Sequence, residues 1–249
     1  MNYADVHFHL LPGVDDGPED MAESVELARA AVADGTTTVV ATPHVRLDFV
    51  TEPLELPERV REVREALERA RVPLRVSCGG ELGHDVVGIL TQAQLEAIAQ
   101  GPEWNRWILV EAPFEGIGAG FHEATAELRE RGFAVVIAHP ERVAFAATEG
   151  MRALRRELAA GSSAQVNAMS LTGGHGADAH AAGHDYVRQG LVRIVASDAH
   201  GEARPPSLGV AWAALIDEGL PPQVAWSVVR EEPTRLLRAG LSPRLRLAA

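Results

Sequence analysis

The alternation of short apolar runs with amphipathic segments is the feature of this sequence that most limits its fold. Seven runs have the length and residue types of strands, and they are Tyr3 to Phe8, Thr36 to Ala41, Leu74 to Cys78, Trp107 to Val110, Ala134 to Ala138, Ala164 to Val166 and Val192 to Ala196. Amphipathic stretches long enough for crossover helices lie between them, including Met21 to Ala33, Glu58 to Ala70, Phe121 to Arg131 and Arg152 to Ala160. Strands that alternate with helices pair in parallel. We therefore expect an α/β fold, either a closed barrel or an open doubly wound sheet.

The chain has no linker, convincing repeat or low-complexity tract that would divide it. It has 249 residues, 46% of them hydrophobic, which is enough to bury a substantial core. We expect a single domain over residues 1–249. Glycines follow several predicted helices, as a left-handed helix cap requires, and these are Gly35, Gly132, Gly161 and Gly190.

Histidine and carboxylate side chains follow successive predicted strands. In order along the chain they are His7, His9, Asp16, His44, Glu81, Glu111, His139, Asp198 and His200. A closed barrel brings all of its C-terminal strand ends to one face, whereas an open sheet would spread these residues along an edge. Because independent placement after so many strands would be a large coincidence, the pattern favours a barrel with a metal site at that face.

Alternation within the first strand adds detail to this prediction. His7 and His9 are two residues apart, so both imidazoles project to the same side and could bind one metal. Asp5 would share that side at a deeper level, where its carboxylate could orient a ligand imidazole. The remaining histidines lack such a pattern, and we expect structural or surface roles for His84, His122, His175, His180 and His184.

Composition excludes several classes of function. A formal net charge of −12 argues against nucleic acid as a partner. The chain starts without a signal-like segment and has no apolar stretch near the roughly 20 residues of a membrane helix, so we expect a cytoplasmic protein without membrane insertion. All 23 basic residues are arginine, which excludes lysine Schiff bases and lysine-bearing phosphate loops.

The single cysteine, Cys78, excludes an intrachain disulfide and also tests one phosphatase mechanism. Cysteine-dependent tyrosine phosphatases need an arginine after five intervening residues, and that position is His84. Glu81 would further disfavour a thiolate nearby. We interpret Cys78 as a buried strand residue.

Several motifs resemble those of the polymerase and histidinol phosphatase (PHP) superfamily of metal-dependent phosphoesterases. The opening segment DVHFHLLPGVDDGPED resembles that of one branch of this superfamily, the bacterial protein-tyrosine phosphatases of capsule and exopolysaccharide loci. Further segments occur in family order, namely ATPH (residues 41–44), GGE (79–81), HPER (139–142), QVN (165–167) and ASDAH (196–200). The resemblance covers most of the chain and implies a distorted (β/α)7 barrel with up to three divalent metals.

The resemblance also implies a role for each residue of the strand-end set. One metal would be held by His7, His9, Glu81 and Asp198, a second by Glu81, Glu111 and His139, and a third by Asp16, His44 and His200. In the DDG motif the family pattern favours Asp16 over Asp15 as the ligand. Mixed imidazole and carboxylate ligands suit manganese, which we expect, or iron or zinc.

The same resemblance implies how phosphate would be bound and attacked. Arg142 and Arg204 match the phosphate-binding arginines, and Arg46 is a third candidate. Three divalent ions among four carboxylates would give the site a net positive charge that fits a phosphate dianion. A hydroxide shared by two metals would attack phosphorus, so no protein nucleophile is needed. The loop after His44 and the segment after Asn167 are expected to line the substrate mouth.

Three functional hypotheses follow. The favoured one is a metal-dependent protein-tyrosine phosphatase acting on a bacterial tyrosine kinase of exopolysaccharide synthesis, as the resemblance implies. The second is a small-molecule phosphatase of the same superfamily, such as a histidinol-phosphate phosphatase. The third is a noncatalytic, metal-stabilised interaction module. Retention of every ligand candidate together with both arginines argues against the third, because a scaffold needs only part of that set.

Overall fold

A computed structural model describes residues 1–50 and 52–243 of the chain. Its strands are β1 (Tyr3–Phe8), β2 (Thr36–Ala41), β3 (His44–Val45), β4 (Arg75–Cys78), β5 (Glu81–Leu82), β6 (Trp107–Glu111), β7 (Ala134–Ala138), β8 (Ser163–Asn167) and β9 (Ile194–Ala196). Its α-helices are α1 (Met21–Asp34), α2 (Leu56–Arg69), α3 (Gln92–Ile98), α4 (Ala119–Glu130), α5 (Met151–Ala159), α6 (Ala168–Leu171), α7 (Ala177–Arg188), α8 (Leu208–Asp217), α9 (Pro222–Trp226) and α10 (Glu232–Ala239). All seven strands expected from the sequence are present.

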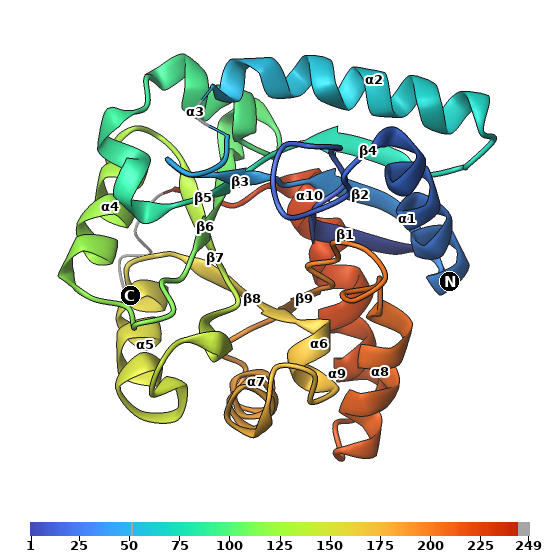
Figure 1. Cartoon of the computed structure of the whole chain (residues 1–249). Coiled ribbons are helices and arrows are strands. Elements are labelled where there is room, and N and C mark those ends of the chain that lie inside the picture. The colour runs from blue at the N-terminus through green and yellow to red at the C-terminus, as the bar shows by residue number, and fades with distance from the viewer. Residues whose placement is uncertain (51, 244–249) are drawn as a thin grey trace.

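The strands form a closed parallel barrel with seven strand positions, surrounded by helices (Figure 1). The strand order is β1-β2-β4 in one sheet and β3-β5-β6-β7-β8-β9 in the other. Short β3 continues the line of β2, and short β5 continues that of β4, so the two sheets share these positions. A parallel bridge between Phe8 and Ala199 joins β1 to the segment after β9 and completes the circle. The expected distorted (β/α)7 barrel is therefore confirmed.

Pro43 and a glycine pair interrupt the two broken strands. Pro43 has no backbone N–H to donate where β2 gives way to β3. On the neighbouring strand, a Cβ on Gly79 would lie 2.6 Å from Val40 Cγ1, and one on Gly80 would lie 2.9 Å from Val45 Cγ2. Both breaks fall just before a candidate ligand, so His44 and Glu81 each begin a new short strand at the mouth of the barrel.

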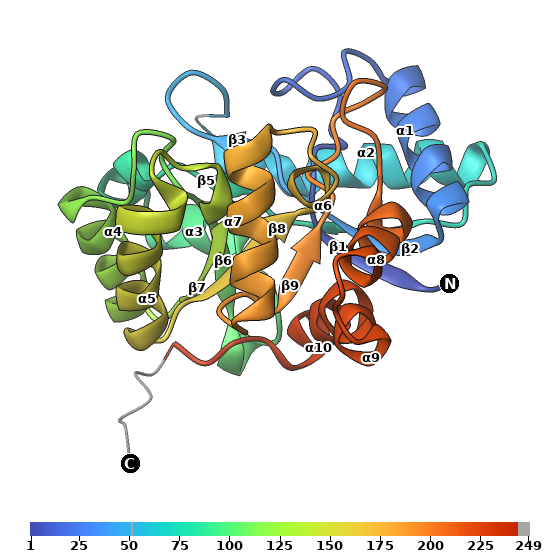
Figure 2. The same ribbon diagram turned by 90° about the horizontal axis from the view of Figure 1, so that it is seen from below.

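Two apolar clusters fill the molecule. The larger one lies between the strands and the outer helices. The smaller one is formed by Val6, Val40, Leu109, Val136 and other strand residues, together with Leu236 of α10. Since each fully buried aliphatic side chain contributes roughly 1.5–3 kcal/mol, both clusters are substantial. Figure 2 shows α10 at the end of the barrel opposite to the direction in which the β9 arrow points.

Helix boundaries follow from local chemistry. The Asp20 carboxylate accepts hydrogen bonds from the backbone amides of Ala22 and Glu23 and begins α1, and Gly35, at φ 99°, ends it. The other three predicted cap glycines also adopt positive φ. Helix α2 begins at Leu56, earlier than the predicted Glu58, because Pro57 is well suited to the first turn. Among the described residues, no helix has the length and apolar character needed to cross a bilayer.

Candidate metal centre

The nine predicted ligands lie together at the C-terminal mouth of the barrel. His7 is in β1, Glu111 ends β6, and His44 and Glu81 begin the short β3 and β5. The others lie in the loops that follow β1, β7 and β9. Two of these loop residues have left-handed backbones, His139 at φ 36° and Asp198 at φ 54°. This conformation is costly for residues other than glycine and recurs at functional sites.

Glu81 is the centre of the cluster and is fully buried. Its Oε2 lies 3.2 Å from His7 Nε2 and 3.0 Å from His44 Nδ1. Its other oxygen, Oε1, lies 2.9 Å from His139 Nε2. Asp198 Oδ1 is 3.2 Å from His7 Nε2 on the other side. A single carboxylate in contact with three imidazoles has the placement of a bridging ligand.

Four groups of side chains each bring ligand atoms within 4.8 Å of one another, and they are His7, His9 and Asp198; His7, Glu81 and His139; His44, Glu81 and Glu111; and His9, Asp16, His44 and His200. Every predicted ligand belongs to at least one group. The grouping differs in detail from the one implied by the family resemblance. Glu111 is grouped with His44 rather than with His139, and His9 also joins the group around Asp16.

The electrostatics of the cluster favour cations. Burial alone would raise the pKa of Glu81, but the surrounding imidazoles lower it well below its usual value. Asp198 behaves in the same way: burial opposes its charge, and His7, His9 and Arg204 lower its pKa. Conversely, burial would lower the pKa of His9, yet its carboxylate neighbours raise it. Negative charge is therefore held on buried oxygens, which is the requirement for binding divalent metals.

Residues next to the ligands fix the orientation of two imidazole rings. Asp15 Oδ2 lies 2.7 Å from His9 Nδ1, and its carboxylate also accepts hydrogen bonds from the backbone amides of Gly17 and His44. Gln165 Oε1 lies 3.1 Å from His7 Nδ1. In both histidines Nε2 is left to face the cluster. Such outer contacts set the tautomer of a metal-binding histidine.

The orienting role expected for Asp5 is wrong. Its buried carboxylate accepts hydrogen bonds from the backbone amides of Ser197 and His7 rather than from an imidazole. Asp5 therefore connects β1 to the segment that carries Asp198. Alternation along β1 places the Asp5 side chain on the inner side but does not identify its partner. The partner is the backbone amide of Ser197, which is far away in the sequence.

Three arginines reach the same mouth. Arg142 Nη1 and Arg204 Nη2 donate to Asp198 Oδ2 at 3.2 and 3.0 Å, and Arg204 Nη1 also donates to Asp16 Oδ2 at 3.3 Å. Arg46 Nη1 donates to Glu111 Oε2 at 3.0 Å. All three line a cleft of about 220 Å³ at the cluster of candidate ligands. Positive side chains thus surround the entrance to this cluster.

Aromatic rings border this cleft. Phe49, from the loop after His44, stacks on the His44 ring with centroids 5.3 Å apart. Phe114 stacks on the His139 ring at 6.0 Å and lies under the Arg142 guanidinium at 4.9 Å. The exposed fractions of Phe49 and Phe114 are 37% and 45%. The expectation that the loop after His44 lines the mouth agrees with the position of Phe49; Thr51 of that loop lies outside the described residues.

The residues expected to stay outside the metal site do so. Cys78 is half-buried at the end of β4, and burial raises the pKa of its thiol to about 11, so it is poorly suited to be a nucleophile. His122 contacts Glu157, His184 contacts the Leu171 carbonyl, and His84 packs on Phe121. His175 lines the neighbouring cavity with Arg142, so the segment after Asn167 does approach the mouth.

Sequence reasoning assigned no function to Asp15, Gln165 and Asn167. Gln165 and Asn167 are inward neighbours on β8, and Asn167 Nδ2 donates to Asp198 Oδ2 at 2.7 Å. The QVN segment contains a pattern that could have indicated them. Its two polar residues are two positions apart in a buried strand, so both side chains point to the same side. Residue type alone, by contrast, does not distinguish Asp15 from Asp16, and only the family resemblance favoured Asp16 as the ligand.

Comparison with known proteins agrees with this arrangement. Residues 3–238 match the model of the CpsB/CapC family of capsular polysaccharide synthesis. The chain belongs to this family. The tyrosine-protein phosphatase YwqE of Bacillus subtilis is 34% identical over 199 residues, which cover 79% of this chain and 76% of YwqE. The tyrosine-protein phosphatase CpsB of Streptococcus pneumoniae is 27% identical over 218 residues, covering 84% and 87% of the two chains.

Solved structures show the same relationship. One from a study of YwqE of Bacillus subtilis and CpsB of Streptococcus pneumoniae, described as metal-dependent tyrosine phosphatases, superposes with a TM-score of 0.81. It is 29% identical and covers 98% of this chain and 100% of its own. A β-aspartyl dipeptidase from Fervidobacterium islandicum, with a TM-score of 0.56, 15% identity and coverage of 99% and 85%, shares the fold alone. The family resemblance inferred from the motifs is confirmed.

Proposed function

We propose that the protein is a metal-dependent protein-tyrosine phosphatase that uses the clustered strand-end residues as its metal ligands. The observation that carries the proposal is the convergence of nine histidine and carboxylate side chains at one mouth of the barrel, where six of them and three arginines line a single cleft. Relatives that match most of the chain are tyrosine-protein phosphatases. Up to three divalent ions would be held, manganese in our proposal, with iron or zinc as the alternatives that suit the same ligands.

The donor set fits such ions. Several buried atoms of the candidate ligands have no hydrogen-bond partner among the described residues, and these are His44 Nδ1, Glu81 Oε2, His139 Nδ1, Asp198 Oδ1 and His200 Nε2. Buried polar atoms without a partner are unusual in a folded protein. Except for His139 Nδ1, each lies in an ion-pair contact of the cluster. Coordination of cations would satisfy the four atoms other than His139 Nδ1.

The metals, when bound, would activate a water molecule and neutralise charge on the phosphate. The chain itself supplies the remaining functions. Arg142 and Arg204 would grip non-bridging phosphate oxygens with two parallel N–H donors each, releasing their contacts to Asp198. Asn167 would keep Asp198 oriented after that release. The raised pKa of the Cys78 thiol and its position at the end of β4 exclude it from this scheme.

The aromatic rim supports an aryl phosphate as the substrate. Phe49 and Phe114 offer two partly exposed rings at the entrance, where a phosphotyrosine ring can stack. Leu47 and Phe145, which are 68% and 75% exposed, extend the apolar surface beside it. A peptide around the tyrosine would find apolar contacts there. We propose a tyrosine kinase of exopolysaccharide synthesis as the substrate, and the cytoplasm, where ATP-dependent phosphorylation occurs, as the place of action.

The experiment compares two substrates in manganese-containing buffer. A phosphotyrosine peptide should be hydrolysed with a higher kcat/KM than histidinol phosphate, and Phe114→Ala should raise KM for the peptide more than for β-glycerophosphate, which has no ring. A higher kcat/KM for histidinol phosphate would replace the proposed substrate with a small phosphomonoester. Equal effects of Phe114→Ala on both KM values would show that Phe114 does not bind the aryl ring of the substrate.

A further inference from the structure

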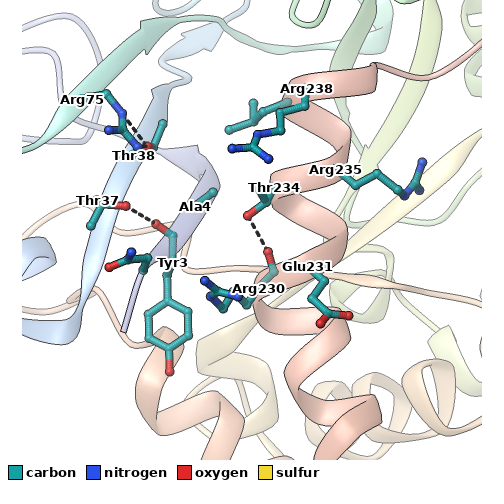
Figure 3. A pocket seen from close by; sticks show the side chains of 12 residues that line it. Tyr3, Ala4, Thr37, Thr38, Arg75, Arg230, Glu231, Thr234, Arg235 and Arg238 are labelled. Carbon is teal, nitrogen blue, oxygen red and sulfur yellow. Dashed lines mark hydrogen bonds between the residues drawn. The ribbon is translucent and has the colours of Figure 1, made fainter.

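A second cavity lies at the opposite end of the barrel from the metal centre. It has a volume of about 670 Å³ and lies between the start of three strands and the last helical segment. Its strand wall contains Tyr3 and Ala4 of β1, Thr37 and Thr38 of β2 and Arg75 of β4. Its helical wall contains residues from Arg230 to Arg238. Figure 3 shows this cavity from close by.

Three arginines face one another across this cavity. Arg230 and Arg238 extend from the helical wall toward β1, and Arg75 lies on the strand wall beside Thr38 (Figure 3). The spacing of Arg230, Thr234 and Arg238 is four residues each time, which places them on one helical face. Arg235 and Glu231 also line the cavity, although in Figure 3 their side chains extend away from the strand wall. The lining thus contains four arginines and one carboxylate and is net positive, in a chain whose formal net charge is −12.

Arg75, Arg230 and Arg238 differ from Arg235 in their partners. Within the part of the chain that the structure describes, no carboxylate forms an ion pair with Arg75, Arg230 or Arg238. Arg75 donates to the neutral Thr38 hydroxyl, at 2.9 and 3.2 Å. Arg230 Nε is buried and has no hydrogen-bond partner among the described residues. By contrast, Arg235 is paired with Glu232.

We propose that this cavity binds the phosphate group of a small phosphate-bearing molecule. Guanidinium groups match phosphate oxygens in geometry and charge, and the hydroxyls of Thr37 and Thr38 add neutral polar groups to the same wall. The volume exceeds what a bare phosphate needs and lies in the usual range of small-molecule sites, roughly 300–1,000 Å³. The cavity is a site separate from the catalytic cleft, because it lies at the N-terminal ends of the strands.

Trp226 provides a local readout. The Arg230 guanidinium lies 5.0 Å from the centroid of the Trp226 ring, so an anion that binds Arg230 changes the field at this indole. The metal-loaded protein is titrated separately with inorganic phosphate and with the methylene-bridged, non-hydrolysable analogue of ADP. Tryptophan fluorescence should change to saturation with at least one probe, and the change should be lost in Trp226→Phe. If the ADP analogue binds more tightly than inorganic phosphate, the ligand of the cavity is a larger phosphate-bearing molecule. If phosphate binds as tightly as the analogue or more tightly, the ligand is the free phosphate ion.

Matched variants assign the signal to the cavity. Arg238→Ala and Arg75→Ala should each weaken the Kd by about tenfold or more, since a charged hydrogen-bond donor is lost. Arg152→Ala removes an equal charge from an exposed position outside the cavity, where Arg152 pairs with Glu149, and should leave the Kd unchanged. The double variant Arg142→Ala/Arg204→Ala, in the catalytic cleft, should retain the Trp226 signal. The proposal is overturned if neither probe saturates, if Arg238→Ala binds as the unmodified chain does, or if the catalytic double variant loses the signal.

Discussion

The Asp15 carboxylate holds the imidazole of His9 through a contact of 2.7 Å between Oδ2 and Nδ1. Its neighbour Asp16 points elsewhere, with Oδ1 lying 3.0 Å from His200 Nε2 and 3.5 Å from His44 Nε2. Asp15 is largely buried, whereas the Asp16 side chain is 45% exposed at the mouth. Two adjacent residues of the same type thus have different positions relative to the metal cluster.

This difference predicts different outcomes for two matched substitutions. Asp16→Asn should remove a metal ligand and lower the number of bound manganese ions. Asp15→Asn should preserve that number but weaken affinity by about 10–100-fold, because His9 loses the charged partner that fixes its ring. Isothermal titration with manganese measures both quantities. Equal stoichiometry and affinity in the two variants would contradict the separate roles.

Replacing Arg142 or Arg204 by lysine should lower kcat/KM for a phosphotyrosine peptide by about 10–100-fold, because a lysine ammonium cannot donate two parallel hydrogen bonds. Inhibition by inorganic phosphate should weaken in parallel. Arg152→Lys is the control, since Arg152 pairs with Glu149 on the exposed surface. Steady-state kinetics with an unchanged kcat/KM in both site variants would show that these arginines do not bind the substrate.

Cys78→Ser should retain kcat/KM within about twofold, because burial raises the pKa of the thiol to about 11 and leaves little thiolate at neutral pH. Iodoacetamide at pH 7 should accordingly leave the activity intact, and mass spectrometry reports whether Cys78 was modified. Loss of activity in Cys78→Ser, with the circular dichroism spectrum unchanged, would point to a thiol mechanism.

Glu157 lies in a buried polar cluster between α4 and α5, and its ionisation makes the free energy of unfolding depend on pH in the acid range. Burial would raise the pKa of Glu157, but hydrogen bonds from His122 and Ser162 and the charge of Arg129 lower it overall. Its contribution to the free energy of unfolding is thus present above the ordinary glutamate pKa, about 4.3, and is lost as the pH falls through the lower folded-state value. Glu157→Gln should lower stability at pH 7 by about 1–3 kcal/mol.

Urea unfolding between pH 3 and pH 7 measures this effect. The difference in unfolding free energy between Glu157→Gln and the unmodified chain should shrink as the pH falls. Glu130→Gln, at the exposed end of α4, should have little effect at any pH. A difference that stays constant down to pH 3 would contradict the lowered pKa of Glu157.

Much of the fold could be predicted because the strands are buried and regularly separated. The runs around Val136 and Val195 are continuous and apolar, as expected for strands covered on both faces of a barrel wall. The short strands β3 and β5 could not be predicted, since two-residue segments have no periodicity. They begin after the breaks at Pro43 and at Gly79–Gly80, and the close packing of Val40 and Val45 against these glycines appears only in the folded structure.

The site was predictable to the level of residue type and strand end, but not to the level of contacts. Convergence of His7, Glu81 and Asp198 follows from closure of the barrel. The partner of Asp5 depends on which backbone amide is free after β9, and the contact of Asp15 with His9 depends on the course of one loop. The arginine cavity at the other end brings together Arg75 and Arg238, which are far apart in the sequence.

The most direct test measures bound metal and phosphatase activity in the same preparation. Elemental analysis and phosphate release from a phosphotyrosine peptide are recorded for the purified protein, after chelation and dialysis, and after manganese is added back. We predict up to three divalent ions per chain, loss of activity with loss of metal, and recovery on addition of manganese. Full hydrolysis of the peptide by a chain without bound metal would contradict the account.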